Sequence, residues 1–576
     1  MLRYFLFLAL VLQVSAQEAM FREVADTATD THVEITALFT RPTPGGYLPV
    51  RVKIANNLKT DRSIRVSFES SVGYDDALNS ESTFDFTAGG GKTLTRDIMV
   101  PVSPSAESSG TSTYVTARLS GSLGMASGTV RAEAGPGQPA VLLSEALFTP
   151  LASTLDSEAN KKFSGRYGSV GFAGKFDPKQ LPADWLAFSG YDNVIMTDGD
   201  WSHVPAGVRN AILSWVRLGG RLMIYSETMP TLSEMDLPEE SGFGSISILP
   251  ISSGGISGGS GFASDIVREV SANPNKPRQN SIANDYSNSW PLQNLYGARK
   301  FRYALFVGVL VIFGILVGPV NLFVFAKAGQ RHRLFITTPI ISLAASLILI
   351  ALIIVQDGFG GSGIRRVLME IRPDAGLNAA YIHQEQFSRT GVLTGSSFTI
   401  DTPATLAPVP IARSRWARFT NHASTGSFNL QPGDGTVQAK GDWYQSRSEQ
   451  GHVLSAVTST RGRIEETDTP GTYLSTFEFP IDSIYYLDES RSWSRASGVQ
   501  AGKRFTFAPV DASMADPELQ KLANDFGGRH RRLFDAVRER PDHFVAVTTQ
   551  APGIGTNPAI RWKETTTVIT GPVVAP

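Results

Sequence analysis

The sequence predicts a multidomain α+β membrane protein, in which a β-sandwich, an α/β unit and a β-rich C-terminal region accompany a two-helix transmembrane hairpin. Two long uncharged segments in the middle of the chain indicate the hairpin. Before them, the apolar residues change from alternating spacing to helical spacing, which separates the sandwich from the α/β unit. The length of 576 residues fits this division, since domains of about 150 residues are common.

The composition excludes several classes of site and partner. The formal net charge is -1 and the pI is about 6.7, so the chain lacks the basic excess of a nucleic-acid-binding protein. The chain contains no cysteine, which excludes disulfides, thiolate metal sites and a cysteine nucleophile. We therefore expect an exported protein of this kind to be stabilised by packing alone.

The N-terminus has the pattern of a signal peptide over residues 1–16. Arg3 is followed by an apolar stretch to Leu12 that is too short to span a bilayer, and the small residues of Val14-Ser15-Ala16 suit cleavage before Gln17. The alternative is an uncleaved anchor.

Residues 17–136 alternate between apolar and polar positions in short runs broken by turn residues, which predicts a β-sandwich. In VRVKIANN, the side chains of Val50, Val52 and Ile54 are expected on one face, and Asn56-Asn57 ends the strand. A strand that closes on an asparagine pair, with a later strand running into VPV, resembles immunoglobulin-like modules of bacterial surface proteins.

Residues 137–290 are expected to form an α/β unit. The β-rich runs AVLLS, YGSVGF, DNVIMT and RLMIYS surround a segment with one continuous apolar helical face. That face is formed by Val208, Ala211, Ile212, Trp215 and Val216. A strand, a helix and a strand in this order predict parallel pairing with a right-handed crossover.

The run YDNVIMTDGDWSHVPAGVRNAILSWVRLGGRLMIYS resembles class I glutamine-amidotransferase-like domains, which have a flavodoxin-like α/β fold and occur in many bacterial membrane-anchored proteins. Amidotransferases of this fold use a cysteine with a histidine and an acidic partner, so their chemistry is not carried over to a chain without cysteine. Thr197-Asp198-Gly199 also resembles a late element of von Willebrand factor A domains. The Asp-x-Ser-x-Ser of those domains is absent after the first strand.

The candidate binding residues are Asp198, Asp200, His203 and Glu227, which follow two predicted neighbouring strands. Ligands of open α/β sheets bind at the carboxyl ends of the strands, and such oxygen ligands suit a hard cation. We favour the interpretation that Asp200 and Ser202 are N-cap residues of the following helix, and Asp198 is the residue to test for ligand binding. Ser257 lies in a formal G-x-S-x-G within a Gly/Ser-rich loop, where a nucleophile elbow is not expected. We predict no catalytic residue, no metal and no cofactor.

Residues 303–326 and 334–355 carry no charge and are each long enough to cross the hydrocarbon core. We expect the cations of the loop 327–333 on the cytoplasmic side. A second basic cluster, Arg299, Lys300 and Arg302, balances the charge count, and the signal peptide decides the orientation.

Small residues at a spacing of four, Gly314 with Gly318 and Ser342 with Ser346, predict close packing of the two spans. Pro319 and Asn321 can kink the first span and offer it a polar group. The spans contain no ionisable residue, so we expect an anchor and not a transport path.

Residues 361–576 contain many alternating runs and predict a further β-rich region of one or two domains. One helix is expected between Pro517 and Arg540, around a Gly-Gly break. Its basic cluster, residues 529–532, fits a solvated face or a contact with anionic lipid or polymer. The aromatic residues of this region fit core packing or sugar stacking. They are Trp416, Trp443, Tyr444, Tyr485, Tyr486 and Trp493.

Together these patterns predict a non-catalytic, membrane-anchored cell-envelope protein whose exported domains bind a protein partner or a surface polymer. The expected partners are the lipid bilayer and an envelope component, without nucleic acid. We expect a multi-pass protein of the cytoplasmic membrane with both large segments on the periplasmic or extracellular side. The alternative function is an exported hydrolase or metal-dependent enzyme that uses the acidic loop around Asp198.

Overall fold

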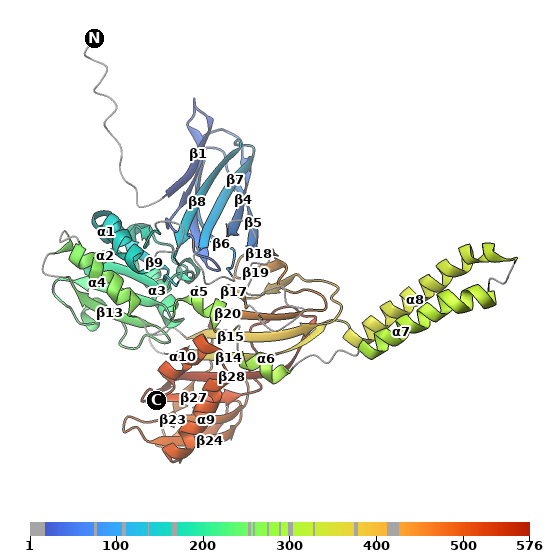
Figure 1. Ribbon diagram of the computed structural model, residues 1–576. Helices are drawn as coiled ribbons and strands as arrows, with labels where there is room; N and C mark the ends of the chain where they lie inside the picture. Colours follow the sequence, from blue (N-terminus) through green and yellow to red (C-terminus); the bar gives the residue numbers. More distant parts are fainter. Residues whose placement is uncertain are drawn as a thin grey trace, which may run out of the picture.

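The computed structural model describes residues 18–73, 78–105, 111–135, 137–163, 170–251, 255–256, 260–272, 276–286, 290–297, 303–325, 329–373, 378–409, 411 and 426–575. The expected signal peptide, the cluster 299–302, Ser257 and Trp416 lie outside these ranges. The structure is a multidomain α+β protein, in which several β-sheets form a body and two apolar helices extend away from it (Figure 1).

The N-terminal strands form two antiparallel sheets that face each other across a common core. The first sheet has the order β1 (Glu18–Asp26), β2 (Thr31–Ala37), β3 (Tyr47–Asn56) and β6 (Lys92–Pro101). The second contains β5 (Leu78–Ala88), β4 (Arg62–Val72), β7 (Thr111–Gly121) and β8 (Ala126–Ala134). Val50, Val52 and Ile54 are fully buried, as their alternation predicts. Asn56 lies at the end of β3, and its side-chain amide donates to the carbonyl oxygens of Thr60 and Ala88, both at 2.9 Å.

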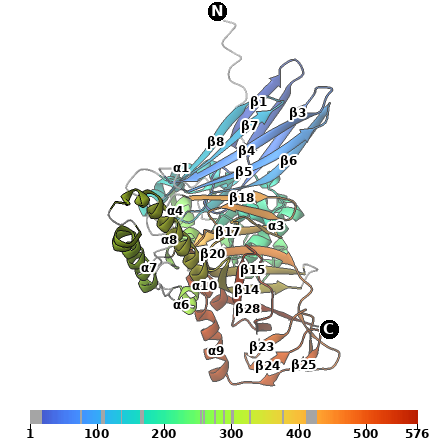
Figure 2. The same cartoon turned by 90° about the vertical axis from the view of Figure 1, so that its right-hand side faces the viewer.

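The second sheet continues into strands from beyond the apolar helices. β18 (Gly426–Pro432) pairs in parallel with β5, and β19 (Val437–Gly441) and β16 (Phe398–Ile400) follow it. The side-chain oxygens of Asn429 and Gln431 also accept hydrogen bonds from the backbone amides of Glu81, at 2.8 Å, and Thr83, at 2.7 Å. Chain segments separated by more than 300 residues therefore share one sheet (Figure 2).

The α/β unit contains a parallel five-stranded sheet. Its order is β10 (Gly174–Phe176), β9 (Val141–Ser144), β11 (Asn193–Thr197), β12 (Arg221–Ser226) and β13 (Ser245–Pro250). Helices α1 (Glu145–Phe163) and α4 (Ser260–Ser271) pack on one face, and α3 (Ala206–Arg217) packs on the other. All five apolar residues predicted on the face of α3 are buried. This face joins the core of the N-terminal sheets, where the ring of Phe188 lies 5.6 Å from Phe39 and 6.2 Å from Trp215.

The C-terminal region is built on a long mixed sheet of order β17-β20-β15-β14-β28-β27-β23-β24-β26. The strands are β14 (Gly361–Arg372), β15 (Ala379–Thr390), β17 (Ala404–Val409), β20 (Glu449–Ser459), β23 (Ile481–Leu487), β24 (Trp493–Val499), β26 (Ala508–Pro509), β27 (His543–Thr548) and β28 (Ile560–Val574). Three short strands, β21 (Ile464–Glu466), β22 (Thr472–Ser475) and β25 (Arg504–Thr506), branch from it. Instead of the one interrupted helix expected, two helices lie over the sheet, α9 (Ala512–Asn524) and α10 (Gly528–Val537). Trp443, Tyr444, Tyr485 and Trp493 are buried, which favours their interpretation as core residues.

Two helical segments are long and apolar enough to cross a membrane, Val307–Phe325 and Arg331–Leu352. The first comprises α7 (Tyr303–Ile315) and the π-helical η5 (Leu316–Phe325), which contains Pro319. The second begins in the short 3-10 helix η6 (Arg331–Arg333) and continues in α8 (Leu334–Asp357). Asn321 is fully buried between them. Its amide donates to Thr338 Oγ1 at 2.9 Å, and its oxygen accepts from Thr337 Oγ1 at 2.6 Å. The polar group expected in the first span thus joins it to the second.

Both ends of this hairpin return to the body. α6 (Pro291–Tyr296) precedes the first span and contacts β14 and β15, and β14 follows the second span. The hydroxyl groups of Tyr296 and Ser362 lie 2.6 Å apart. Because the chain before the hairpin meets the chain after it here, the start of the first span and the end of the second span lie close together.

Candidate functional site

The acidic loop after β11 is the first turn of a short helix, α2 (Asp198–His203). Thr197 is its N-cap: the Thr197 hydroxyl accepts from the Asp200 amide at 3.0 Å, and the Asp200 carboxylate accepts from the Thr197 amide at 3.1 Å. This reciprocal capping box satisfies two free amides at once. The prediction that Asp200 and Ser202 are N-caps is therefore wrong in position, because the helix begins earlier and a second helix, α3, follows after Pro205.

Asp198 joins the ends of two neighbouring parallel strands. One of its carboxylate oxygens accepts from the Ser226 hydroxyl at the end of β12, at 2.6 Å, and the other accepts from the Gly199 amide at 2.7 Å. Glu227 follows Ser226 and is exposed at the same edge. His203 is exposed too, and its Nδ1 lies 2.7 Å from the carbonyl oxygen of Gly199.

The four candidate residues thus share one edge of the sheet without contacting one another directly. Asp200 and His203 bond to their own helix, whereas Asp198 and Glu227 flank Ser226. Within the described residues, no three histidine, aspartate or glutamate side chains gather in a way that could hold a metal ion. The geometry at this edge provides capping and a strand-to-strand link.

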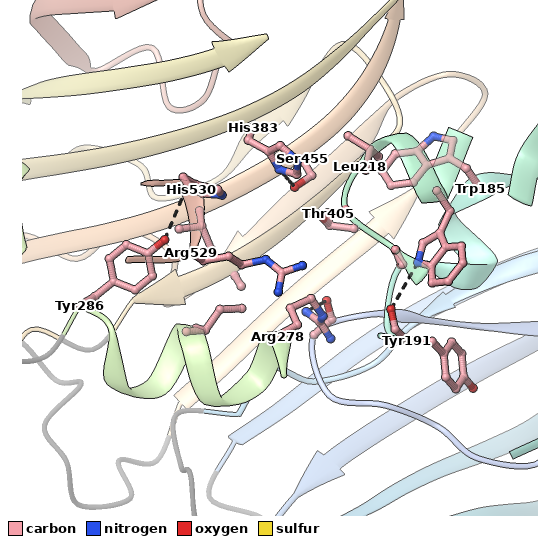
Figure 3. Close-up of a pocket in the computed structure, with 18 residues that line it drawn as sticks. Trp185, Tyr191, Leu218, Arg278, Tyr286, His383, Thr405, Ser455, Arg529 and His530 are labelled. Carbon is pink, nitrogen blue, oxygen red and sulfur yellow. Dashed lines mark hydrogen bonds between the residues drawn. The ribbon is translucent and has the colours of Figure 1, made fainter. Parts of the chain in front are cut away.

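A cavity of about 60 Å³ lies at the opposite, amino-terminal edge of the parallel strands (Figure 3). Tyr191 and Gly220, which precede β11 and β12, line it from the α/β unit. Arg278 and Tyr286 line it from α5 (Arg278–Asn284) and its C-terminal end, His383 from β15, and Arg529 and His530 from α10. The cavity therefore lies where the chain before the hairpin meets the chain after it.

A buried glutamate holds these segments together next to the cavity. The Glu385 side chain is fully buried and accepts hydrogen bonds from Trp290 Nε1 at 2.9 Å, the Tyr286 hydroxyl at 3.1 Å and the Gly527 amide at 2.9 Å. His530 Nδ1 lies 2.5 Å from the same carboxylate. Burial and the nearby carboxylate raise the pKa of Tyr286 well above its usual value, so this phenol remains a donor. A buried carboxylate needs such a complete set of partners.

His383 and Ser455 form a hydrogen-bonded pair in the cavity wall, with Nδ1 and Oγ 2.9 Å apart. Burial, together with the charges of His530 and Arg529, lowers the pKa of His383 well below 6.5, so its ring is neutral. The ring centroids of Phe243 and His530 lie 5.3 and 5.1 Å from it. In the described part of the chain, no carboxylate orients this histidine, so the pair lacks the third member of a nucleophilic triad.

This cavity could not be predicted from the sequence. Arg278, His383 and Arg529 come from three distant segments and form no motif. The basic cluster at residues 529–532 is expected on a solvated face or against lipid or polymer, but Arg531 is its only exposed residue. His530 is buried against Glu385, and Arg532 donates to Asp285 at 2.9 Å.

Comparison with known proteins gives no family for this chain: no family model and no curated protein matches it. Among solved structures, a Paenibacillus sp. cycloisomaltooligosaccharide glucanotransferase complexed with cycloisomaltoheptaose is similar over 33% of this chain, at 15% identity and a TM-score of 0.17. The likeness spans 27% of that enzyme's chain. A TM-score this low carries no argument about fold or activity.

Proposed function

We propose that this chain is a membrane-anchored cell-envelope protein whose body lies outside the cytoplasm and binds a protein partner or a surface polymer, without catalysis. One observation carries the proposal: the body is assembled from chain on both sides of the apolar hairpin. β5 pairs with β18, and Trp290 donates to Glu385. Segments in such contact must lie on one side of the membrane, so the hairpin enters and leaves through the same face.

The signal peptide predicted over residues 1–16 decides the orientation, and the charges of the connecting loop are compatible with it. Arg331 and Arg333 are exposed in the short turn η6 (Arg331–Arg333), at the start of the second span. The end of the hairpin where α7 and α8 are joined lies farthest from the body (Figure 1). Short loops rich in arginine and lysine tend to stay in the cytoplasm, which would leave the body on the other side. The basic cluster at residues 299–302 has the opposite effect, so the charge count is balanced. The third cation of the loop, Lys327, lies outside the described residues.

We also propose that the α/β unit is a glutamine-amidotransferase-like domain of flavodoxin-like fold that has no nucleophile. The strand order supports this: numbered along the chain from β9, it is 2-1-3-4-5 with all strands parallel, which is the flavodoxin-like order. The chain contains no cysteine. A binding role uses such a scaffold without the family's chemistry.

Single cysteines test the placement sharply, because the chain contains none of its own. Asn210→Cys reports on the α/β unit, Met514→Cys on the C-terminal region and His332→Cys on the loop, and all three positions are exposed. A membrane-impermeant maleimide should label the first two in cells whose outer barriers have been opened, and His332→Cys only after the inner membrane is permeabilised. Labelling of Asn210→Cys or Met514→Cys only after permeabilisation would place the body in the cytoplasm.

A further inference from the structure

Arg278 is half-buried and places its guanidinium next to the cavity, where no carboxylate of the described residues accepts a hydrogen bond from it. Its guanidinium donates to the carbonyl oxygens of Pro44 at 2.6 Å, Gly45 at 3.3 Å and Gly190 at 3.4 Å. Its Nε is buried and meets no acceptor among the described residues. Burial is the main cause that lowers the pKa of Arg278 to about 10; the nearby carboxylate of Asp192 opposes this shift, and the charge of Arg529 adds to it. Carbonyl dipoles fix this side chain but do not neutralise it.

Arg529 lies on the opposite wall and extends from α10 toward Arg278 (Figure 3). In the part of the chain that the structure describes, no side chain or carbonyl group accepts a hydrogen bond from its guanidinium, and it forms no ion pair. Burial also lowers the pKa of Arg529. Two guanidinium groups that face one cavity repel each other, and an anion between them would offset that repulsion.

The neighbouring carboxylates are already engaged elsewhere. Asp192 accepts from the backbone amides of Ala140, at 2.9 Å, and Arg278, at 2.8 Å. Asp285 accepts from Lys276, at 3.1 Å, and from Arg532. The carboxylate of Glu385 is saturated by the donors described above. These groups moderate the positive potential but supply no oxygen to the two guanidinium groups that line the cavity.

We propose that the cavity between Arg278 and Arg529 binds a small tetrahedral oxyanion of the phosphate or sulfate type. Planar guanidinium groups match the oxygen edges of such ions and can donate to two oxygens each. Thr405 lines the same cavity and adds a hydroxyl donor. A cavity of about 60 Å³ has room for roughly four to six water-sized groups, since one water needs on the order of 10–15 Å³. That size suits a small tetrahedral ion.

The bound anion would link two segments of the chain that are distant in sequence. Arg278 belongs to the chain before the hairpin and Arg529 to the chain after it, so one ion would bridge the two. Binding to the folded state alone stabilises that state. This inference rests on the assembled body and does not depend on the orientation in the membrane.

The test uses the full-length protein in nanodiscs of zwitterionic lipid. Calorimetry with inorganic phosphate and with sulfate, at ionic strength matched by chloride, should show saturable binding in the millimolar range or tighter. The same ions should raise the melting temperature, Tm, in a saturable way. Concentrations stay low because both ions stabilise proteins generally when concentrated. Absence of saturable binding to the unaltered protein would overturn the proposal.

Three variants assign the binding to this cavity. Arg529→Gln should weaken binding of the anion at least tenfold, and Arg529→Lys, which keeps the charge, should weaken it less. Arg531→Gln is the matched control, because Arg531 is exposed on the same helix and pairs with Asp535 at 3.7 Å. It should bind like the unaltered protein. In chloride alone, Arg529→Gln should keep or raise the Tm, because it removes a repulsion. Equal affinity in Arg529→Gln and the unaltered protein would show that the site is elsewhere.

Discussion

The carboxylate of Asp198 links the end of β12 to the first turn of α2, so substitutions of this one residue should change stability. Asp198→Asn keeps an acceptor oxygen for the Ser226 hydroxyl, so we expect a change in unfolding free energy below about 1 kcal/mol. Asp198→Ala removes the acceptors for Ser226 and the Gly199 amide and should cost about 1–2 kcal/mol. Shifts in Tm in detergent micelles provide the measurement.

The enzyme hypothesis makes the opposite prediction for the same residue. If Asp198 held a catalytic cation, the unaltered protein would bind Mg²⁺, Ca²⁺ or Mn²⁺ in calorimetry, and Asp198→Asn would abolish that binding. We expect no binding of these cations that depends on Asp198. Glu239→Gln serves as the control, since Glu239 is exposed and is not one of the candidate binding residues.

The ionisation of Glu240 should make the contact between the α/β unit and the C-terminal sheet depend on pH. The ring of His543, whose Nε2 lies 3.2 Å from the carboxylate, and a hydrogen bond from Arg372, at 2.6 Å, lower the pKa of Glu240 from 4.5 to about 2. Its stabilising contribution is therefore complete above pH 4.5 and is lost as the pH falls toward 2. Glu240→Gln should remove part of the acid sensitivity of Tm in that window, and Glu239→Gln should retain it. Identical pH profiles for the two variants would contradict this role.

Among the elements, those with strong local periodicity could be predicted from sequence. The apolar residues of α3 recur at helical spacing, and the two spans are continuous apolar runs, so the local sequence pattern alone identifies these elements. The start of α2 could not be found this way. Thr197 occupies the last position of a strand, and its role as N-cap appears only when the Asp200 carboxylate folds back onto its amide.

The hydrogen bonds of Asn321 allow the packing of the two spans against each other to be tested. Its bonds to Thr337 and Thr338 join η5 to α8 inside the apolar region. Asn321→Leu should weaken this contact by about 1 kcal/mol, in the range measured for interhelical hydrogen bonds in membranes. The loss is limited because Thr337 also donates to the Arg333 carbonyl oxygen. Hydrogen exchange of the η5 amides should become roughly fivefold faster. Leu322→Ile, next to Asn321, should leave it unchanged.

At the scale of the whole molecule, the sheet and the cavity that are formed by segments distant in sequence could not be predicted. Pairing of β5 with β18 and the meeting of Arg278, His383 and Arg529 have no local signature, because neither depends on the residues that adjoin it in sequence. The division into consecutive domains followed from local composition. The shared sheet shows that the chain before the hairpin gains part of its packing from the chain after it.

Splitting the chain tests this interdependence. Co-expressed fragments 1–328 and 329–576 are separated in the loop between the spans, and we expect them to co-purify as one body. Fragment 1–328 alone should aggregate, because it exposes the β5 edge and the aromatic side chains of Tyr286 and Trp290. Soluble, folded fragment 1–328 with the Tm of the pair would contradict the shared sheet.

A variant in the split pair locates the contact. Asn429→Ala with Gln431→Ala removes the two side-chain oxygens that accept from β5 amides, at 2.8 and 2.7 Å, and leaves those amides without their protein acceptors. Each lost hydrogen bond should cost about 1 kcal/mol, so the two together should make the fragments dissociate roughly thirtyfold more readily. Gln438→Ala is the control, because Gln438 is exposed on β19, one strand farther from β5. Equal dissociation of both variants would show that β18 does not hold the halves together.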